Sequence, residues 1–244
     1  MRYSLLIEYD GSTFCGWQRQ KEGLSVQQVL EEALKTALRE DITLFGSGRT
    51  DAGVHAFGQV AHFDTSKEVS PLKLRESLNA LVRPHPISIK EVKIVSDTFH
   101  ARFDAKKRTY IYKIFNAPFP PVLQKNRVWW IRHPLDIKKM NDCAQLLIGK
   151  HDFSTFRASE CQAKSPIKTL DNISFSKEGD EIIMYIQARS FLHHQVRNII
   201  GTLSLVGMGK WDMNDFKNAF EAHDRRRGGP TAPPEGLYFF KIEY

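Results

Sequence analysis

Residues 25–38 read SVQQVLEEALKTAL, and this stretch determines how the first part of the chain is interpreted. Its apolar residues recur at intervals of three and four, the spacing of an amphipathic helix. They are Val26, Val29, Leu30, Ala33, Leu34, Ala37 and Leu38. Ser25 stands directly before them, and serine is a favoured N-cap residue. We therefore predict a helix that begins after Ser25 and has one apolar face.

Strand patterns lie on both sides of this helix. Residues 3–9 form the first strand, closed by Asp10-Gly11, and residues 42–45 and 58–63 form the next two. Ser70-Pro71 opens a second helix with proline at its first position, which runs to about Leu81. Residues 87–95 complete the unit as a strand. The order β-α-β-β-α-β is the split βαβ arrangement of ferredoxin-like sheets.

The second half shows a looser version of the same pattern. It contains strands at 109–115 and 237–243, a hairpin of 168–175 with 181–188, and helices at 137–148, 193–206 and 213–222. Residues 225–234 have the composition of a long loop, which makes them a candidate functional segment. We predict an α+β fold of two ferredoxin/RRM-like halves, 1–103 and 104–244. The halves are expected to form a mixed, mostly antiparallel sheet with helices on one side and a central basic cleft.

Composition excludes several classes of protein. The chain has 244 residues, 41% of them hydrophobic and 26% charged, as is ordinary for a globular protein. No apolar stretch approaches the roughly 20 residues of a membrane span. The early Glu8 interrupts any signal-peptide core. The three cysteines (Cys15, Cys143 and Cys161) form no CxxC pair and suit a reducing cytoplasm. We expect a cytoplasmic protein with no membrane association.

The basic charge is concentrated in the middle of the chain. The net charge is +7, and residues 99–168 hold 14 of the 35 basic residues but only 5 of the 28 acidic ones. Such a concentration is typical of a polyanion-binding surface; the alternative is a solvated face without a partner. Aromatic and basic residues alternate here, which favours unpaired RNA over duplex DNA, unless rings such as Trp129, Trp130 and Tyr112 belong to the core. The alternating residues are Phe99, His100, Arg102, Phe103, Lys106, Lys107, Arg108, Tyr110, Tyr112, Arg127, Trp129, Trp130 and Arg132.

Residues 46–56, GSGRTDAGVHA, form a glycine-shaped loop between two predicted strands. It is not a dinucleotide site, because GxGxxG must open a helix, and the chain contains no GxxxxGK[ST]. We therefore expect no nucleotide cofactor. Asp51, two residues after Arg49, suggests an acid or nucleophile with its electrostatic partner. The alternative is a hairpin loop in which Asp51 accepts hydrogen bonds from backbone N–H groups.

Several blocks, taken in order, resemble the bacterial tRNA pseudouridine synthase A family. They are GSGRTDAGVHA, YDGSTFCGWQRQ, FHARFDAKKRTYIYKI, HDFSTFRASECQAK, FLHHQVRNIIG and PPEGLYF, which together span the chain. The stretch between residues 118 and 136 is less similar. The resemblance implies isomerisation of uridines 38, 39 and 40 in the tRNA anticodon stem-loop, without a cofactor. The N1–C1′ bond breaks, the uracil rotates and C5 is joined to C1′.

The resemblance also implies roles for individual residues. Asp51 is expected to be the catalytic nucleophile; whether it attacks C1′, attacks C6 or removes the 2′ proton stays open. Arg197 is expected to pair with that aspartate, although without the resemblance it reads as an ordinary helix-surface residue. Tyr110 is expected to stack on the uracil or relay the C5 proton. Leu237 resembles the apolar wall against the uracil, and Arg49 the residue that fills the space left by the flipped base.

The strand predicted at 109–115 and the adjacent histidines each allow an alternative interpretation. Because strand residues alternate between faces, one tyrosine of Tyr110 and Tyr112 is expected in the core. The adjacent His193 and His194 are expected on different faces of their helix and lack an HExxH motif. We therefore expect no metal.

Further residues are expected to contact RNA. The block Phe99, His100, Arg102 and Phe103 supplies one set, with Arg102 as a phosphate contact. Cys161 and Lys164 lie in a segment that the family uses against tRNA, with Lys164 on a phosphate and the cysteine incidental. The resemblance also implies a homodimer in which one tRNA touches both subunits.

Other functions explain the sequence less completely. A non-catalytic RNA-binding module accounts for the basic aromatic region but not for Asp51 beside an arginine, and no RNP1 run is present. A uridine C5 methyltransferase needs a nucleophilic cysteine in a recognisable context, and none of the three has one. A scaffold role has no supporting repeat.

Overall fold

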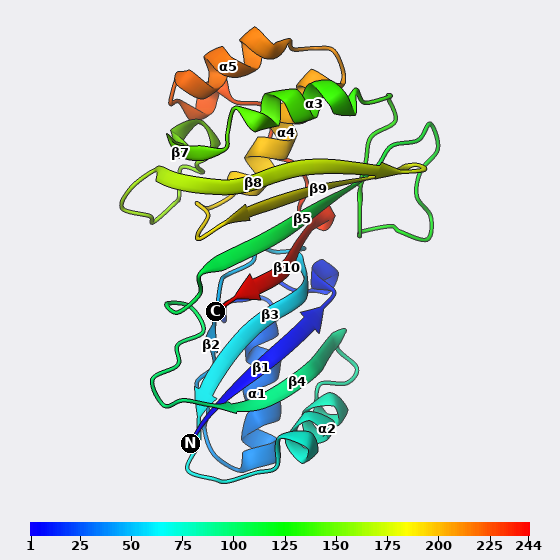
Figure 1. Cartoon of the computed structure of the whole chain (residues 1–244). Helices are drawn as coiled ribbons and strands as arrows, with labels where there is room; N and C mark the ends of the chain where they lie inside the picture. Colours follow the sequence, from blue (N-terminus) through cyan, green and yellow to red (C-terminus); the bar gives the residue numbers. More distant parts are fainter. The chain divides into compact units, whose positions relative to one another are not determined.

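The computed structural model describes residues 1–244 as an α+β protein with five α-helices and ten strands. The chain divides into two compact units, which are described separately below (Figure 1). The N-terminal unit contains residues 1–106 together with 238–244, and the C-terminal unit contains residues 107–237. The predicted α+β class is confirmed. The sequence-based halves were 1–103 and 104–244, so the last strand is grouped here with the N-terminal unit.

The N-terminal unit has the predicted β-α-β-β-α-β order. Its elements are β1 (Arg2–Tyr9), α1 (Val26–Leu38), β2 (Phe45–Gly46), β3 (His55–Asp64), α2 (Pro71–Leu81) and β4 (Ile87–Val95). β1 lies between β4 and β3 and is antiparallel to both. β2 pairs antiparallel with one end of β3, and β10 (Leu237–Glu243) pairs parallel with the start of β3. The sheet is therefore mixed but mostly antiparallel, as predicted.

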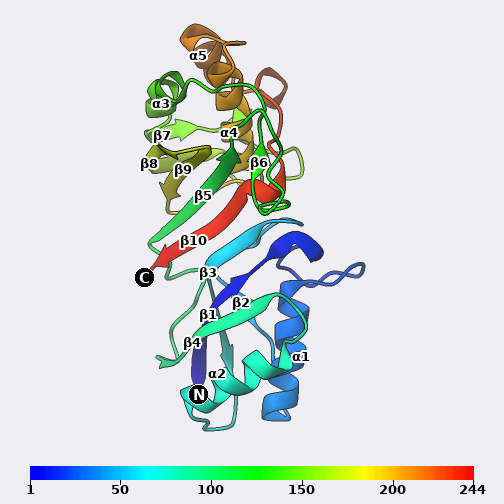
Figure 2. The same cartoon turned by 90° about the vertical axis from the view of Figure 1, so that its right-hand side faces the viewer.

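One face of this sheet carries the core. Alternate residues of β1 are buried, namely Tyr3, Leu5, Ile7 and Tyr9. α1 and α2 pack against each other, and both lie on the same side of the strands (Figures 1 and 2). Ser25 caps α1 as predicted, accepting a hydrogen bond from the Gln28 N–H at 3.1 Å. The opposite face of the sheet has no helix over it within this unit.

The C-terminal unit contains five strands and three helices. Its strands are β5 (Lys107–Phe115), β6 (Trp129–Trp130), β7 (Gly149–Asp152), β8 (Ile167–Glu178) and β9 (Glu181–Ala188). Antiparallel pairs give the order β5-β9-β8-β7, with β6 parallel to β5. The helices are α3 (Ile137–Gln145), α4 (Gln195–Gly207) and α5 (Met213–Glu221). α4 is buried along most of its length and packs against α3 and α5.

Three details differ from the sequence-based prediction. The strand expected at 42–45 is largely misplaced, since only Phe45 belongs to β2. Leu44 bonds to α1 instead: its N–H donates to Glu31 and its C=O accepts from Gln27. β6 and β7 were missed because so few residues show no periodicity. The loop at 225–234 contains two short 3-10 turns, Arg225–Arg227 and Pro234–Gly236. None of the helices is long and apolar enough to cross a bilayer.

Candidate active site

The loop 46–56 is held in place by side chains from its own unit. The Ser47 hydroxyl donates to Gln59 Oε1 at 2.6 Å, and Gln59 Nε2 donates to the Gly48 carbonyl at 2.8 Å. The Thr50 hydroxyl shares a 2.8 Å hydrogen bond with the phenol of Tyr9. Gln59 and Tyr9 are buried, so these hydrogen bonds are shielded from water. The loop is therefore a fixed platform rather than a mobile connection.

The N-terminal motif around residues 9–20 packs directly against this loop. The Trp17 N–H donates to the Thr50 carbonyl at 3.1 Å, and the Gly53 N–H donates to the Phe14 carbonyl at 3.4 Å. A Cβ on Gly11 would lie only 2.0 Å from the Val54 carbonyl oxygen. Only glycine allows this approach of two backbones. Two motifs that are far apart in sequence thus form one local structure.

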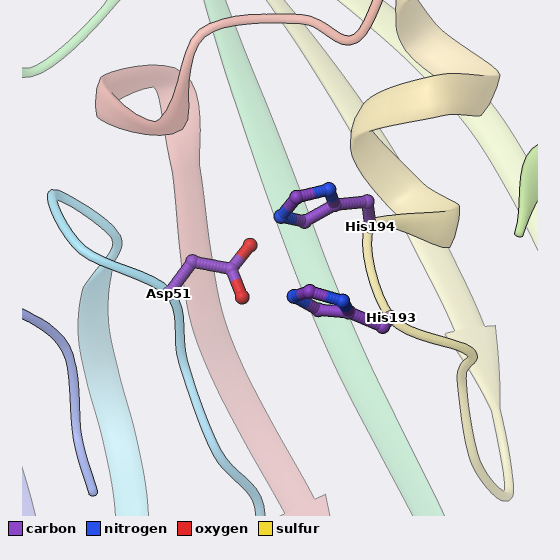
Figure 3. A group of neighbouring side chains, drawn as sticks. All are labelled: Asp51, His193 and His194. Atoms are coloured by element: carbon purple, nitrogen blue, oxygen red, sulfur yellow. The ribbon is translucent and has the colours of Figure 1, made fainter. Parts of the chain in front are cut away.

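Asp51 and Arg49 project from this platform. Asp51 is half-buried, and its side chain extends from the segment that leads into β3 (Figure 3). Its backbone carbonyl accepts from the Val54 N–H at 3.2 Å, which closes the turn that follows it. Arg49 is exposed, and its Nε donates to Gln18 Oε1 at 3.1 Å. The structure therefore presents a carboxylate and a guanidinium on the same rigid loop.

Tyr110 lies in the middle of β5 in the C-terminal unit. It is 8% exposed, and its ring meets Phe191 edge-on with centroids 5.3 Å apart. Tyr112 is fully buried and donates to the Pro233 carbonyl at 2.7 Å. One tyrosine was expected in the core, and the structure buries both. Residues two apart on a strand share a face, and both rings are buried.

The helix expected to begin at His193 begins at Gln195 instead. His194 adopts a left-handed conformation (φ 60°) at the N-cap position, so the segment before it is not helical. The rings of His193 and His194 lie side by side, 3.9 Å apart (Figure 3). The prediction that they lie on different helix faces is therefore wrong.

Arg197 lies in the first turn of α4 and is half-buried. Its Nε donates to the Ala232 carbonyl at 2.8 Å, and its own carbonyl accepts from the Ala232 N–H at 3.1 Å. This reciprocal pair fixes the guanidinium group relative to the 228–233 segment. Leu237, at the end of the same unit, is 6% exposed.

The 157–164 segment brings Cys161 next to His193. Arg157 donates to the carbonyls of Cys161 and Ala163, and the His193 N–H donates to Cys161 Sγ at 3.4 Å. Burial raises the pKa of the Cys161 thiol, but hydrogen bonds from Ala163, His193 and Arg157 outweigh it and the net pKa is lowered. Lys164 is exposed at the end of this segment.

The block around residues 99–103 forms an aromatic surface in the N-terminal unit. His100 Nδ1 accepts from the Arg102 N–H, and Phe103 is 68% exposed with the Arg102 guanidinium 5.8 Å from its ring. Sequence analysis missed Phe45, which is 44% exposed and stacks on His62 at 5.1 Å. The only available signal was an aromatic residue at an outward position of a predicted strand.

The sequence is similar to those of known proteins along its whole length. The family model for tRNA pseudouridine synthases matches residues 5–104 and 143–244. A tRNA pseudouridine synthase A of Parvibaculum lavamentivorans is 52% identical over 243 residues, covering 100% of this chain and 99% of the relative. One of Rhodospirillum rubrum is 50% identical over 244 residues, covering 100% of this chain and 88% of the relative. The chain belongs to the tRNA pseudouridine synthase family.

Proposed function

We propose that this chain converts uridine to pseudouridine at positions 38, 39 and 40 of the tRNA anticodon stem-loop, with Asp51 as nucleophile toward a flipped-out base. The N1–C1′ bond breaks and C5 bonds to C1′. The C5 proton leaves and N1 gains a proton, so no oxidant, donor or cofactor is needed. Family membership supports the reaction itself. The particular positions rest on the motif resemblance.

The proposed role of Asp51 rests on the hydrogen bonds that hold its loop in place. The loop around it is hydrogen-bonded through buried groups, and a carboxylate held this way loses little freedom when it meets the substrate. An aspartate that merely closed a turn would need no such support. The packing of residues 9–20 against the loop has a direct explanation if the position of the Asp51 carboxylate determines the rate.

The other residues divide into roles around the base. We propose Arg197 as the cationic partner of the catalytic carboxylate, because its guanidinium is fixed and an opposite charge keeps a carboxylate ionised. Tyr110 supplies a flat, mostly buried ring for stacking on uracil, with a phenol that can relay the C5 proton. Leu237 supplies apolar surface against the base. Arg49 fills the space that the flipped nucleotide leaves in the stem.

The remaining contacts are proposed to hold the RNA backbone and its unpaired bases. Arg102 and Lys164 are exposed cations suited to phosphates, and Phe103 offers an exposed ring for stacking. Phe99 and His100 belong to the same proposed contact, and the His100 ring packs against Phe103 with centroids 4.3 Å apart. Cys161 only shapes the segment that carries Lys164. We place the reaction in the cytoplasm, since all three cysteines are free thiols, as a reducing compartment maintains them.

We also propose that the protein acts as a homodimer. The helix-free face of the N-terminal sheet contains a groove of about 580 Å³ with a mainly apolar floor (Leu6, Phe57, Val60, Phe99, Phe240 and Ile242). We call it the open face. Three ion pairs surround it: Lys90 with Glu8, Lys93 with Glu91 and Lys241 with Glu243.

The three ion pairs form the rim of the open face, and their charge favours protein over RNA as the partner. Each lysine there has a glutamate, so the rim has no net positive charge with which to attract phosphates. Equal numbers of both signs allow the same surface to meet itself across a two-fold axis. The apolar floor supplies the driving force for association.

The test of the proposed function is tritium release from tRNA labelled at uridine C5. The purified protein, with no added cofactor, should release tritium into water, and carbodiimide adducts should map to the anticodon arm. Asp51→Asn should abolish release and leave tRNA affinity within a few-fold of wild type, because the isostere removes only the charge. Asp41→Asn, on an exposed residue paired with Lys35, is the matched control and should keep full activity.

The same experiment separates the enzyme from a non-catalytic RNA-binding module. A module would bind tRNA in both forms and release no tritium in either. Loss of cooperative unfolding in Asp51→Asn would make the residue structural and would contradict its assignment as nucleophile.

A further inference from the structure

Arg225 is an unusual arginine within the C-terminal unit. It is half-buried, and burial lowers the pKa of its guanidinium from the ordinary value. Its Nη1 donates to the Gly229 carbonyl at 2.8 Å. Its Nη2 donates to Asn198 Oδ1 and to the Thr231 hydroxyl, both at 3.1 Å. All three acceptors are neutral, so the group serves to connect parts of the chain rather than to balance charge.

The acceptors connect α4 with residues 228–233, which we call the strap. The Gly229 N–H donates to the Thr202 hydroxyl at 2.9 Å, and the Thr231 hydroxyl donates to Asn198 Oδ1 at 2.6 Å. The strap also lies directly on the helix backbone. A Cβ on Gly201 would come within 1.8 Å of the Pro230 carbonyl oxygen, so only glycine permits this contact.

The strap in turn orients Arg197. The Ala232 carbonyl accepts from Arg197 Nε at 2.8 Å, which fixes the plane of that guanidinium. At the far end, the buried Tyr112 donates to the Pro233 carbonyl at 2.7 Å. The position of the Ala232 carbonyl therefore depends on three anchors: Tyr112 on β5, the Arg225 network on α4, and the bond from the Ala232 N–H to the Arg197 carbonyl.

We propose that Arg225 is a positioning residue: by tying the strap to α4 it holds the Ala232 carbonyl where Arg197 needs it. This inference rests on the proposed role of Arg197 as partner of the catalytic carboxylate. Misplacement of a reacting group by about 1 Å can cost on the order of 100-fold in rate. Loss of the Arg225 network therefore affects turnover, not tRNA affinity.

The neighbouring Arg226 offers a matched control. It carries the same charge one residue away, but its side chain is 89% exposed and pairs with Asp224 at 2.6 Å. Arg226 donates to neither α4 nor the strap in any of its hydrogen bonds. Removing its charge leaves the Arg225 network intact.

The experiment compares Arg225→Gln, Arg225→Lys and Arg226→Gln in steady-state tritium release. Arg225→Gln should lower kcat about 30-fold with KM for tRNA within about three-fold. Arg225→Lys should recover part of the loss, since lysine keeps the charge but lacks the planar fork. Arg226→Gln should keep kcat within about two-fold of wild type. Amide hydrogen exchange at Gly229, Thr231 and Ala232 should become faster in Arg225→Gln only.

The proposal for Arg225 is overturned by either of two results. An unchanged kcat in folded Arg225→Gln overturns the proposal, as does a raised KM with unchanged kcat, which would make Arg225 a phosphate contact. If Arg225→Gln does not fold, Thr231→Val replaces it. That variant removes one hydroxyl from the network and should lower kcat about five-fold; an unchanged kcat there also overturns the proposal. A wild-type protein that releases no tritium overturns the proposed function, whereas the exchange measurement still tests the strap.

Discussion

Gly11→Ala tests whether the N-terminal motif exists to place Asp51. The added Cβ would lie 2.0 Å from the Val54 carbonyl oxygen and 2.6 Å from its carbon, both backbone atoms that cannot rotate away. Ordinary contact needs about 3.4 Å, so the two backbones must separate by roughly 1.4 Å. Gly11 is itself held, because its N–H donates to the buried His55 Nδ1 at 3.0 Å.

The displacement is therefore transmitted to the loop. The Val54 N–H bonds to the Asp51 carbonyl, so a shift of Val54 carries the Asp51 carboxylate, the proposed nucleophile, with it. A misplacement of about 1 Å should lower kcat on the order of 100-fold. Overpacking should also cost about 1–3 kcal/mol of unfolding free energy, which corresponds to a fall in Tm of roughly 2–12 °C for a chain of this size.

The assay is single-turnover tritium release at saturating enzyme, together with thermal unfolding by circular dichroism. Gly179→Ala is the control, because Gly179 has φ +56° and no atom within 4 Å of an added Cβ. It should lose about 1 kcal/mol of stability from the left-handed backbone and keep full activity. A folded Gly11→Ala with a single-turnover rate within three-fold of wild type would refute the reasoning.

Three further outcomes are expected. Lys164→Ala and Arg102→Ala should each weaken tRNA binding across substrates and reduce the salt slope of log affinity by about one phosphate; an unchanged slope removes the residue from the RNA contacts. Phe240→Asp, on the open face, should convert the dimer to monomers in light scattering, whereas Leu72→Asp, on the exposed side of α2, should not; a monomeric wild type would contradict the dimer. His62 has its pKa lowered to about 4, chiefly by burial and then by His100 and Arg2. The unfolded chain therefore binds the proton first, and unfolding free energy should fall as pH drops from about 6.5 toward 4. His62→Asn should show a shallower fall in urea titrations; equal falls in both proteins would contradict this assignment.

The order of elements in the N-terminal unit was predictable from sequence because its signals are local. Helix α1 was expected from apolar spacing and the Ser25 cap, α2 from proline at its first position, and β4 from its alternating pattern. Each signal depends on residues close in sequence. The strand at 42–45 failed because Leu44 bonds to Glu31 and Gln27, residues of α1 that no local pattern connects to it.

In the candidate site, too, features within one contiguous motif were predictable and contacts between distant segments were not. Asp51 and Arg49 could be identified from a single contiguous motif. The histidine pair could not be placed, because the left-handed backbone at His194 makes the helix begin two residues later than apolar spacing indicates. Phe45 was missed because its value as an exposed ring depends on His62 and His100 from other segments.

The sequence by itself therefore determined the fold class of the N-terminal unit and the family, and it indicated the 46–56 loop as the candidate site, because all three depend on contiguous blocks of residues. Only the tertiary structure decided how those blocks support one another: the packing of Gly11 against Val54, the neutral acceptors around Arg225 and the carbonyl that orients Arg197. Apart from the local bonds of Arg225 to Gly229 and Thr231, these contacts join residues tens of positions apart. Their energies depend on distances that the folded chain alone sets, and no local periodicity encodes them.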